Sequence, residues 1–336
     1  MFLAPFHELF AMFPAMPILR LLADGTFHSG EALGHALRLS RTAIWKQVQL
    51  LSGEGIGVEA VRGKGYRIPG GLDLLDVGRI KAGLSEESRA VRLVVDLFDV
   101  VDSTNAVALS RLRIGERTGY ACLAESQTAG KGRRGRSWVS PFASNIYLSI
   151  IHEFAAGFST IDGLSLAIGV VVCEALESLG IEDVGLKWPN DIIFDGAKLG
   201  GILIEVAGDI GGACQAVIGI GVNVTMNTRT AQAIDQDWTD LTRAGLARGR
   251  RNDVAAAVLD GVLRCVREFE RDGLSVFLSR WRRFDLLFAR HIDVLSGDTV
   301  VSGVMEGVDS TGALIVRSDA GVRMFRSGEV SVRGWQ

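Results

Sequence analysis

The most chemically informative segment of the chain is a glycine-rich basic loop, Gly130-Lys131-Gly132-Arg133-Arg134-Gly135-Arg136-Ser137-Trp138. Glycines allow a backbone to approach a ligand closely. Lys131 and Arg133 can pair with a carboxylate or a phosphate, and Trp138 can cover an adenine ring. The alternative is a generic basic run for RNA binding or nuclear targeting, but such runs seldom lie inside a folded domain. We therefore interpret the loop as a binding site for an anionic ligand.

The letters of this loop satisfy GxGxxG, but the loop lacks the context of a dinucleotide-binding fingerprint. That fingerprint follows a strand and opens a helix within a βαβ unit. Here Trp138, Val139, Ser140 and Pro141 follow, and these residues do not begin a helix. The P-loop pattern GxxxxGK[ST] is absent. A Rossmann fold is therefore not expected.

Three further segments carry matching chemistry. They are Asp102-Ser103-Thr104-Asn105, Lys187-Trp188-Pro189-Asn190-Asp191 and Lys198-Leu199-Gly200-Gly201-Ile202-Leu203-Ile204-Glu205. The first ends an apolar strand in small hydrogen-bonding groups, although it could equally be a plain helix cap. The second places a cation, an aromatic ring and a carboxylate in five residues. Lys198 could be a solvated strand end, but the two glycines after it would weaken a strand unless something packs closely on them.

These segments lie within residues 90–287, whose pattern indicates a mixed α/β domain. The strand-like stretches are VRLVVDLFDVV, NIYLSII, IIF, KLGGILIEV and QAVIGIGVNV. The stretches GLSLAIGVVVCEALESLG and DVAAAVLDGVLRCVREFERDG have helical length and periodicity. Most strands follow one another without an intervening helix. We therefore expect an antiparallel or mixed sheet backed by helices rather than a doubly wound one.

Residues 17–68 predict three helices followed by a hairpin, which is the plan of a winged helix-turn-helix. Ser29 and Ser40 can cap the second and third helices, and IGVEAVRGKGYRI alternates around a glycine turn. The region carries seven basic and four acidic side chains. The residues expected to contact DNA are Ser40, Arg41, Thr42, Trp45, Lys46 and Gln49 on the third helix, and Arg62, Lys64 and Arg67 on the wing. The alternative is a trihelical interaction module with a solvated basic face.

The rest of the chain predicts smaller elements around these two regions. Residues 288–336 form short alternating stretches broken by turns, which predicts a small SH3-like β-barrel. Residues 69–89 are expected to be a linker. Residues 1–16 are an apolar extension with an acidic Glu8 and no basic start, which argues against a signal peptide or a membrane span. The fold class is therefore α+β.

Composition narrows the function classes. With 336 residues, 48% of them hydrophobic, the chain can bury a core without disulfide or metal staples. The net charge of −3 predicts no global attraction to nucleic acid. The four cysteines form no CxxC pair and the histidines show no metal-ligand spacing, so we expect a reduced cytoplasmic setting and no protein-held metal.

Taken together, GKGRRGRSW, KWPND, KLGGILIE and GIGVNV resemble the biotin–protein ligases, in their order and spacing. The similarity runs from about Ile18 to the C-terminus. The predicted winged helix resembles the form that also serves as the biotin operon repressor. In that form an arginine is common where this chain has Lys131, which keeps the charge but cannot make a bidentate fork.

The resemblance implies a role for each matching position. Biotin would contact Ser103, Thr104, Asn105, Gln127, Lys131, Gly132, Arg133 and Lys198, and ATP or the adenylate would contact Gly130, Lys131, Arg133, Arg134, Trp138 and Asn190. Arg133, Lys187 and Lys198 would be catalytic, and Asn190 or Asp191 would help to orient nucleotide or Mg²⁺.

The implied reaction joins biotin and ATP into biotinyl-5′-AMP and passes biotin to a lysine of the biotin carboxyl carrier subunit of acetyl-CoA carboxylase. The two anions repel, and fixed cations with Mg²⁺ would lower that barrier. An adenylate-bound homodimer would bind operator DNA, and no membrane is involved. Two alternatives stay open: a lipoate–protein ligase, and a biotin-sensing transcription factor without ligase activity.

Overall fold

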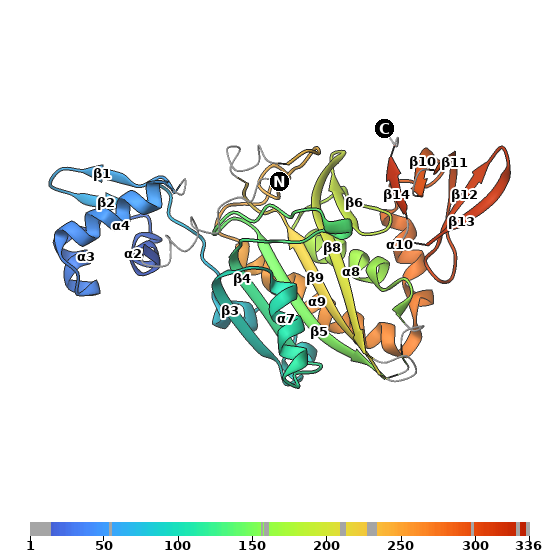
Figure 1. The fold of residues 1–336 in the computed structure, drawn as a ribbon, viewed down its shortest axis with the longest axis horizontal. Coiled ribbons are helices and arrows are strands. Elements are labelled where there is room, and N and C mark those ends of the chain that lie inside the picture. The colour runs from blue at the N-terminus through green and yellow to red at the C-terminus, as the bar shows by residue number, and fades with distance from the viewer. Residues whose placement is uncertain are drawn as a thin grey trace. The chain divides into compact units, whose positions relative to one another are not determined.

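The structure of the protein, a computed structural model, describes residues 15–53, 56–155, 157, 161–208, 213–226, 234–296, 299–326 and 330–333. The chain divides into two compact units, Met1–Leu74 and Leu75–Gln336 (Figure 1). Of the predicted N-terminal extension, 1–16, only Ala15 and Met16 lie within the described residues. Both are buried, and the first of the described helices already begins at Met16, before Pro17.

The first unit has the predicted arrangement of helices and hairpin. Its elements are α2 (Met16–Leu22), α3 (Gly30–Leu37), α4 (Arg41–Gly53), β1 (Glu59–Val61) and β2 (Gly65–Arg67). The side chains of Ser29 and Ser40 accept hydrogen bonds from the backbone N–H groups of Ala32 and Ala43, at 3.0 and 3.2 Å. These bonds satisfy N–H groups that a helix start leaves open. The winged helix-turn-helix prediction is confirmed.

The second unit begins with two helices that lie within the predicted linker range of residues 69–89. These helices, α5 (Val77–Ala82) and α6 (Glu86–Arg89), both contact the long helix α9 (Arg251–Asp272). Leu75, Ile80 and Leu84 are buried in the main core. Helices of six and four residues are too short to show a clear hydrophobic period, which is why the sequence did not indicate them.

A seven-stranded mixed sheet forms the centre of this unit. Its strands are β3 (Val94–Val101), β4 (Tyr120–Gln127), β5 (Ile146–Phe154), β6 (Val184–Lys187), β7 (Asp191–Phe194), β8 (Ala197–Gly208) and β9 (Cys214–Val222). The order across the sheet is β3-β4-β5-β9-β8-β7-β6. Only β3 and β4 are parallel, joined by α7 (Thr104–Arg113), and the other pairs are antiparallel. The prediction of a mixed rather than a doubly wound sheet is confirmed.

Helices cover both faces of this sheet. In Figure 1, α7 lies in front of it, and α8 (Leu164–Ser178) and α9 lie behind it. On β4, Ala121 and Leu123 point into the core with α8 and α9, whereas Tyr120 and Cys122 pack beneath α7. The alternation follows from the two-residue period of a strand. Helix α8 is apolar around most of its circumference because it lies between the sheet and α9.

The chain continues through η5 (Leu274–Phe277) and α10 (Leu278–Phe284) into a second, five-stranded antiparallel sheet. Its strands are β10 (His291–Ser296), β11 (Thr299–Val308), β12 (Leu314–Ser318), β13 (Gly321–Phe325) and β14 (Val330–Arg333). The order is β13-β12-β11-β10-β14, and no pairing closes β13 onto β14 among the described residues. The C-terminal sheet is thus confirmed, and the SH3-like barrel is not.

Candidate active site

The parallel pair β3–β4 brings the first predicted site residues together. Parallel strands end at the same edge of a sheet, and Val101 pairs with Gln127. Ser103 is the N-cap of α7 but makes no capping hydrogen bond with its side chain. Thr104 donates its backbone N–H to Gln127 Oε1 at 2.9 Å. Ser103 and Gln127 line one cavity, whereas Thr104 lies buried behind its wall.

The basic loop folds back on itself as a small hairpin with a 3₁₀ turn, η2 (Arg133–Gly135), at its tip. The Trp138 N–H donates to the Gly130 carbonyl at 2.8 Å, and the Gly132 N–H donates to the Arg136 carbonyl at 2.7 Å. No α-helix follows, as predicted. Gly130 is buried outside the cavity lining, where a Cβ would lie 2.5 Å from the Trp138 carbonyl oxygen.

Three glycines on adjacent strands form the cavity floor. Register pairs Gly201 with Gly221 and Leu203 with Gly219, all on the cavity side of β8 and β9. The Trp138 ring packs directly on this floor, because a Cβ on Gly221 would lie 2.6 Å from its Cε2 atom. Of the two glycines after Lys198, Gly200 is closely packed, because a Cβ there would lie 2.8 Å from the Gly221 carbonyl oxygen, and Gly201 lies in ordinary contact with the Trp138 ring, so the expectation of close packing is confirmed.

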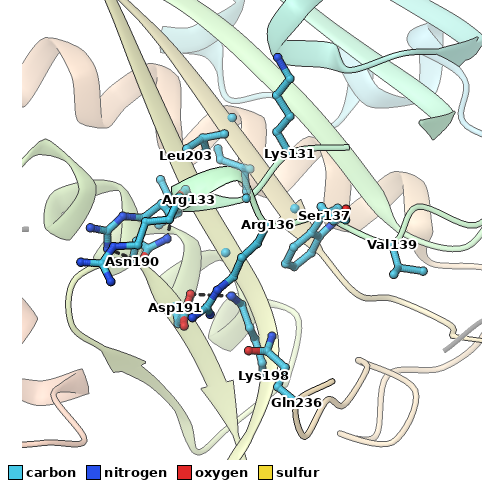
Figure 2. A pocket seen from close by; sticks show the side chains of 18 of the residues that line it. Lys131, Arg133, Arg136, Ser137, Val139, Asn190, Asp191, Lys198, Leu203 and Gln236 are labelled. Carbon is cyan, nitrogen blue, oxygen red and sulfur yellow. Dashed lines mark hydrogen bonds and ion pairs between the residues drawn. The ribbon is translucent and has the colours of Figure 1, made fainter. Parts of the chain in front are cut away.

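Two charged contacts order the cation-rich part of the cavity, and Figure 2 shows both. Arg133 Nη1 donates to Asn190 Oδ1 at 3.1 Å. Lys198 Nζ lies 2.7 Å from Asp191 Oδ1 and 5.5 Å from the centre of the Trp138 ring. Burial lowers the pKa of the Arg133 guanidinium from its usual value, with the neighbouring Asp191 acting in the opposite direction. The site therefore holds a partly desolvated cation, which pairs strongly with an anion.

The KWPND segment forms the turn between β6 and β7, so Lys187 pairs with Asp191 across the hairpin. The Trp188–Pro189 peptide bond is cis. Trp188 is buried and donates its ring N–H to the Gly312 carbonyl at 3.0 Å. The C-terminal sheet thereby holds the turn that carries Lys187, Asn190 and Asp191.

The cavity has a volume of about 780 Å³, which lies within the size range of ordinary ligand pockets. Its lining includes six basic and two acidic side chains, an excess of four positive charges. These charged residues are Lys131, Arg133, Arg134, Arg136, Lys187 and Lys198, against Asp191 and Asp235. Such a cavity suits an anionic ligand.

Most of the predicted site residues lie around this one cavity. The lining includes Ser103, Asn105, Gln127, Lys131, Gly132, Arg133, Arg134, Trp138, Lys187, Asn190 and Lys198. Within this set the exposed side chain of Lys131 points away from Arg133 and Asn190 (Figure 2). Thr104 and Gly130 lie outside the lining and support it from behind.

Several residues of the cavity lining were not predicted from the sequence. Gly219 and Gly221 alternate with buried Ile220 and Val222. This alternation could have indicated a strand that carries no side chains on one of its faces. The segment 234–238 also contributes, because the Asp237 carbonyl accepts the Lys198 N–H at 3.0 Å. No local pattern indicates that contact.

Among the described residues, no group of three or more His, Cys, Asp or Glu side chains could hold a metal ion. The four cysteines are buried and unpaired. Within the same residues no helix is long and apolar enough to span a membrane.

A second candidate site lies on the winged helix. On α4 the side chains Arg41, Thr42, Trp45, Lys46 and Gln49 are exposed, as are Ser40, Arg62 and Lys64, while Ile44, Val48 and Leu51 are buried. Arg67 lies on the wing as expected and is half-buried, and its Nε lies 2.6 Å from Glu59 Oε2. Its guanidinium also stacks 4.5 Å from the centre of the Phe27 ring.

The chain matches known families over each part of this architecture. Residues 97–223 match the biotin/lipoate A/B protein ligase family, residues 16–67 match a helix-turn-helix domain, and residues 290–333 match the biotin protein ligase C-terminal domain. The bifunctional ligase/repressor BirA of Salmonella typhimurium is 43% identical over 95% of this chain and 97% of that protein. The Escherichia coli protein of the same name is 41% identical over the same shares.

A solved structure shares the fold of the second unit. The biotin protein ligase of Aquifex aeolicus, in complex with biotin and ATP, superposes with a TM-score of 0.61 at 27% identity. It covers 71% of this chain and 98% of its own. The present chain belongs to the biotin protein ligases, within the biotin/lipoate A/B protein ligase family. Its winged helix gives it the form of the bifunctional ligase/repressors.

Proposed function

We propose that the protein activates biotin with ATP to biotinyl-5′-AMP and transfers biotin to a lysine of a biotin carboxyl carrier protein. One observation carries the proposal. The strand order places uncharged polar groups of Ser103 and Gln127 over β3–β4 and cations over β6–β8, with the glycine floor between them. Biotin has the same polarity, with a neutral cyclic urea at one end and a carboxylate at the other.

In the first half-reaction a carboxylate oxygen of biotin attacks the α-phosphorus of ATP, and pyrophosphate leaves. Both reactants are anions, so the barrier contains a large electrostatic repulsion. Arg133, Lys187 and Lys198 line the cavity and would hold the two anions in contact while neutralising charge. Trp138 would pack against the adenine ring, with Arg134 and Asn190 contacting the adenylate.

In the second half-reaction the ε-amine of the acceptor lysine attacks the carbonyl carbon of the mixed anhydride, and AMP leaves. No side-chain nucleophile of this protein is required. The loop of Lys131, Gly132 and Arg133 would shield the anhydride from water between the two steps.

Mg²⁺ would accompany the nucleotide in this scheme. Ions bound to ATP commonly use one or two protein carboxylates and take their remaining ligands from phosphates and water. Asp191 is our candidate for this role, because its carboxylate lines the cavity; it pairs with Lys198 at 2.7 Å, and Mg²⁺ would compete with that pair. Bound Mg²⁺ would supply further charge neutralisation.

A lipoate–protein ligase is the second candidate. Lipoate shares the carboxylate but has an apolar dithiolane ring. Ser103, Asn105 and Gln127 place hydrogen-bonding groups where that ring would lie. These groups favour a ligand with a polar ring, and we therefore prefer biotin.

We further propose that the winged helix binds operator DNA and that the adenylate-bound protein is a homodimer. Exposed Arg41, Lys46 and Gln49 carry donors suited to phosphates and base edges. Sedimentation with and without biotinyl-5′-AMP tests the dimer, and a monomer in both conditions would contradict it.

We also propose that residues 288–336 close into an SH3-like barrel. Contacts between β13 and β14 in solution would establish the closure.

The test of the ligase function is biotin-dependent exchange of labelled pyrophosphate into ATP by the purified protein. Exchange with biotin and none with lipoate is the expected result. Biotin binding without any exchange would instead favour a biotin-sensing transcription factor that performs no chemistry.

A further inference from the structure

The side chain of Glu205, on β8, lies behind the cavity rather than in its lining. Glu205 Oε2 accepts a hydrogen bond from Asn105 Nδ2 at 2.7 Å, and this amide also approaches the Leu203 carbonyl at 3.4 Å. Asn105 is 4% exposed and lines the cavity. The contact therefore joins a partly buried carboxylate to a buried amide of the ligand site.

We propose that Glu205 is a positioning residue for biotin selectivity, which it exerts by fixing the polarity of the Asn105 amide. The proposal rests on the function proposed above. A carboxylate can only accept hydrogen bonds, so the amide nitrogen of Asn105 must face Glu205. Rotating the amide by half a turn would bring two acceptor oxygens together at about the same separation, and they would repel.

The oxygen of Asn105 is thereby turned toward Ser149 and the cavity floor. The Ser149 hydroxyl lies 2.6 Å from Asn105 Oδ1 and 2.8 Å from Thr104 Oγ1. A Cβ on Gly219 would lie 2.2 Å from Asn105 Oδ1, so this oxygen lies directly over a floor glycine. Ser149 has one hydroxyl proton, and donating it to Asn105 requires Thr104 to donate to Ser149 rather than to Gln127 Oε1, which lies 3.2 Å from Thr104 Oγ1.

An acceptor fixed at this place discriminates between ligand rings. A cyclic urea has two N–H donors, which need acceptors when the ring is buried. A dithiolane ring has no N–H donor and gains nothing from such an acceptor. Gln127 Oε1 accepts the Thr104 N–H at 2.9 Å and Asn105 Oδ1 accepts the Ser149 O–H at 2.6 Å, so each oxygen keeps one lone pair for a ligand. The structure thus assigns one acceptor to Asn105 and its orientation to Glu205.

Calorimetric titration of the full-length protein with biotin tests this assignment. Glu205→Ala should raise the Kd for biotin about tenfold, which is the effect of one lost buried hydrogen bond. The KM for biotin in pyrophosphate exchange should rise with it, while the KM for ATP stays unchanged. Glu205→Gln keeps an amide oxygen that can accept from Asn105 and should remain within about threefold of the parent.

Glu153 provides a matched control on the same sheet. Its Oε2 accepts from the side-chain amide of Gln215 at 2.8 Å, away from the cavity. Glu153→Ala removes the same kind of amide–carboxylate contact, together with an ion pair to Arg117 at 3.1 Å, and should leave the Kd for biotin within about twofold of the parent. Equal affinities in Glu205→Ala and Glu153→Ala would overturn the proposal.

A polarity swap provides a second test that does not depend on Glu205→Ala folding. Asn105→Asp places a carboxylate against Glu205 and should abolish measurable biotin binding. Combining Asn105→Asp with Glu205→Gln restores a donor opposite an acceptor. The double variant should bind biotin at least tenfold more tightly than Asn105→Asp alone. A double variant no better than the single one would contradict the role of Glu205. A parent protein that neither binds biotin nor exchanges pyrophosphate would instead refute the proposed function.

Discussion

Arg133 illustrates how the environment of one side chain sets its chemistry. It lies at the tip of the loop hairpin and donates to Asn190, and its partial burial lowers the pKa of its guanidinium. A guanidinium stays charged even when its pKa falls, so the consequence is stronger pairing with an anion rather than proton release. This residue is therefore the one we expect to retain the adenylate most directly.

Arg133→Ala is expected to shorten the lifetime of bound biotinyl-5′-AMP by tenfold or more, because a charged hydrogen bond to the ligand is lost. Release of the preformed adenylate, followed after rapid dilution, measures the effect. Arg113→Ala, at the exposed end of α7, is the control and should leave the lifetime unchanged. An unchanged lifetime in Arg133→Ala would exclude its retaining role.

Asp285 should give the protein a measurable pH dependence of stability. Burial raises the pKa of this carboxyl from 3.8 to about 6. Its Oδ1 accepts the Leu287 N–H at 2.9 Å, whereas Oδ2 has no hydrogen-bond partner among the described residues. A raised carboxyl pKa favours folding most below pH 3.8, and this contribution is lost as the pH rises through about 6.

The free energy of unfolding should therefore fall between pH 5 and 8 by about 1.4 kcal/mol through this group. Asp285→Asn keeps an oxygen for the Leu287 N–H and removes the titration. Urea unfolding of both proteins at the two pH values measures the difference. The same pH dependence in parent and variant would show that Asp285 does not cause it.

At the scale of elements, the start of α9 is tied to the sheet by a buried ion pair. Arg251 Nη1 lies 2.5 Å from Glu125 Oε2, and the two side chains are 2% and 3% exposed. Arg251 also donates to the Asn145 carbonyl through Nε and Nη2, at 2.9 and 2.8 Å. Glu125 Oε1 accepts the Leu75 N–H at 2.7 Å. One pair therefore joins β4, the start of β5, α9 and the beginning of the second unit.

Arg251→Ala should lower the free energy of unfolding by about 3–5 kcal/mol, because it leaves the Glu125 charge buried without its partner. Chemical denaturation provides the measurement. Arg264→Ala is the matched control on the same helix, where an exposed Arg264 lies 3.1 Å from Asp260, and it should cost less than about 1 kcal/mol. Equal losses in the two variants would refute a special role for the buried pair.

At the scale of the whole molecule, the winged helix and the cavity lie in separate compact units. The exposed cations Arg41 and Lys46 are on α4 of the first unit, and every residue lining the cavity belongs to the second. Changes on α4 should therefore act on DNA affinity without changing the chemistry of the cavity.

The double variant Arg41→Ala/Lys46→Ala should weaken operator binding by about tenfold or more and reduce its salt dependence. Biotin-dependent pyrophosphate exchange should stay unchanged. Fluorescence anisotropy at two salt concentrations measures the binding, and Glu31→Ala on α3 serves as the control variant. Unaltered DNA affinity would show that the DNA-binding surface does not include these residues of α4.

The sequence by itself determined the local elements and the chemical character of the site. Ser29 and Ser40 begin helices because their hydroxyls satisfy open N–H groups nearby in the chain, and this relation is readable from adjacent residues. The two glycines after Lys198 indicated close packing for the same reason, because the destabilisation that a glycine causes in a strand is a local effect. The motifs together identified the family, and the comparisons confirmed it.

Only the tertiary structure decided which groups meet. The pairs Arg133–Asn190, Asn105–Glu205 and Glu125–Arg251 join residues between 57 and 126 positions apart in the chain. Their contacts depend on the strand order β3-β4-β5-β9-β8-β7-β6 and on register, which no periodicity specifies. The same register turned Gly219 and Gly221 into a cavity floor and placed Thr104 behind the wall. A side chain's type is local, whereas its partner is set by how distant segments pack.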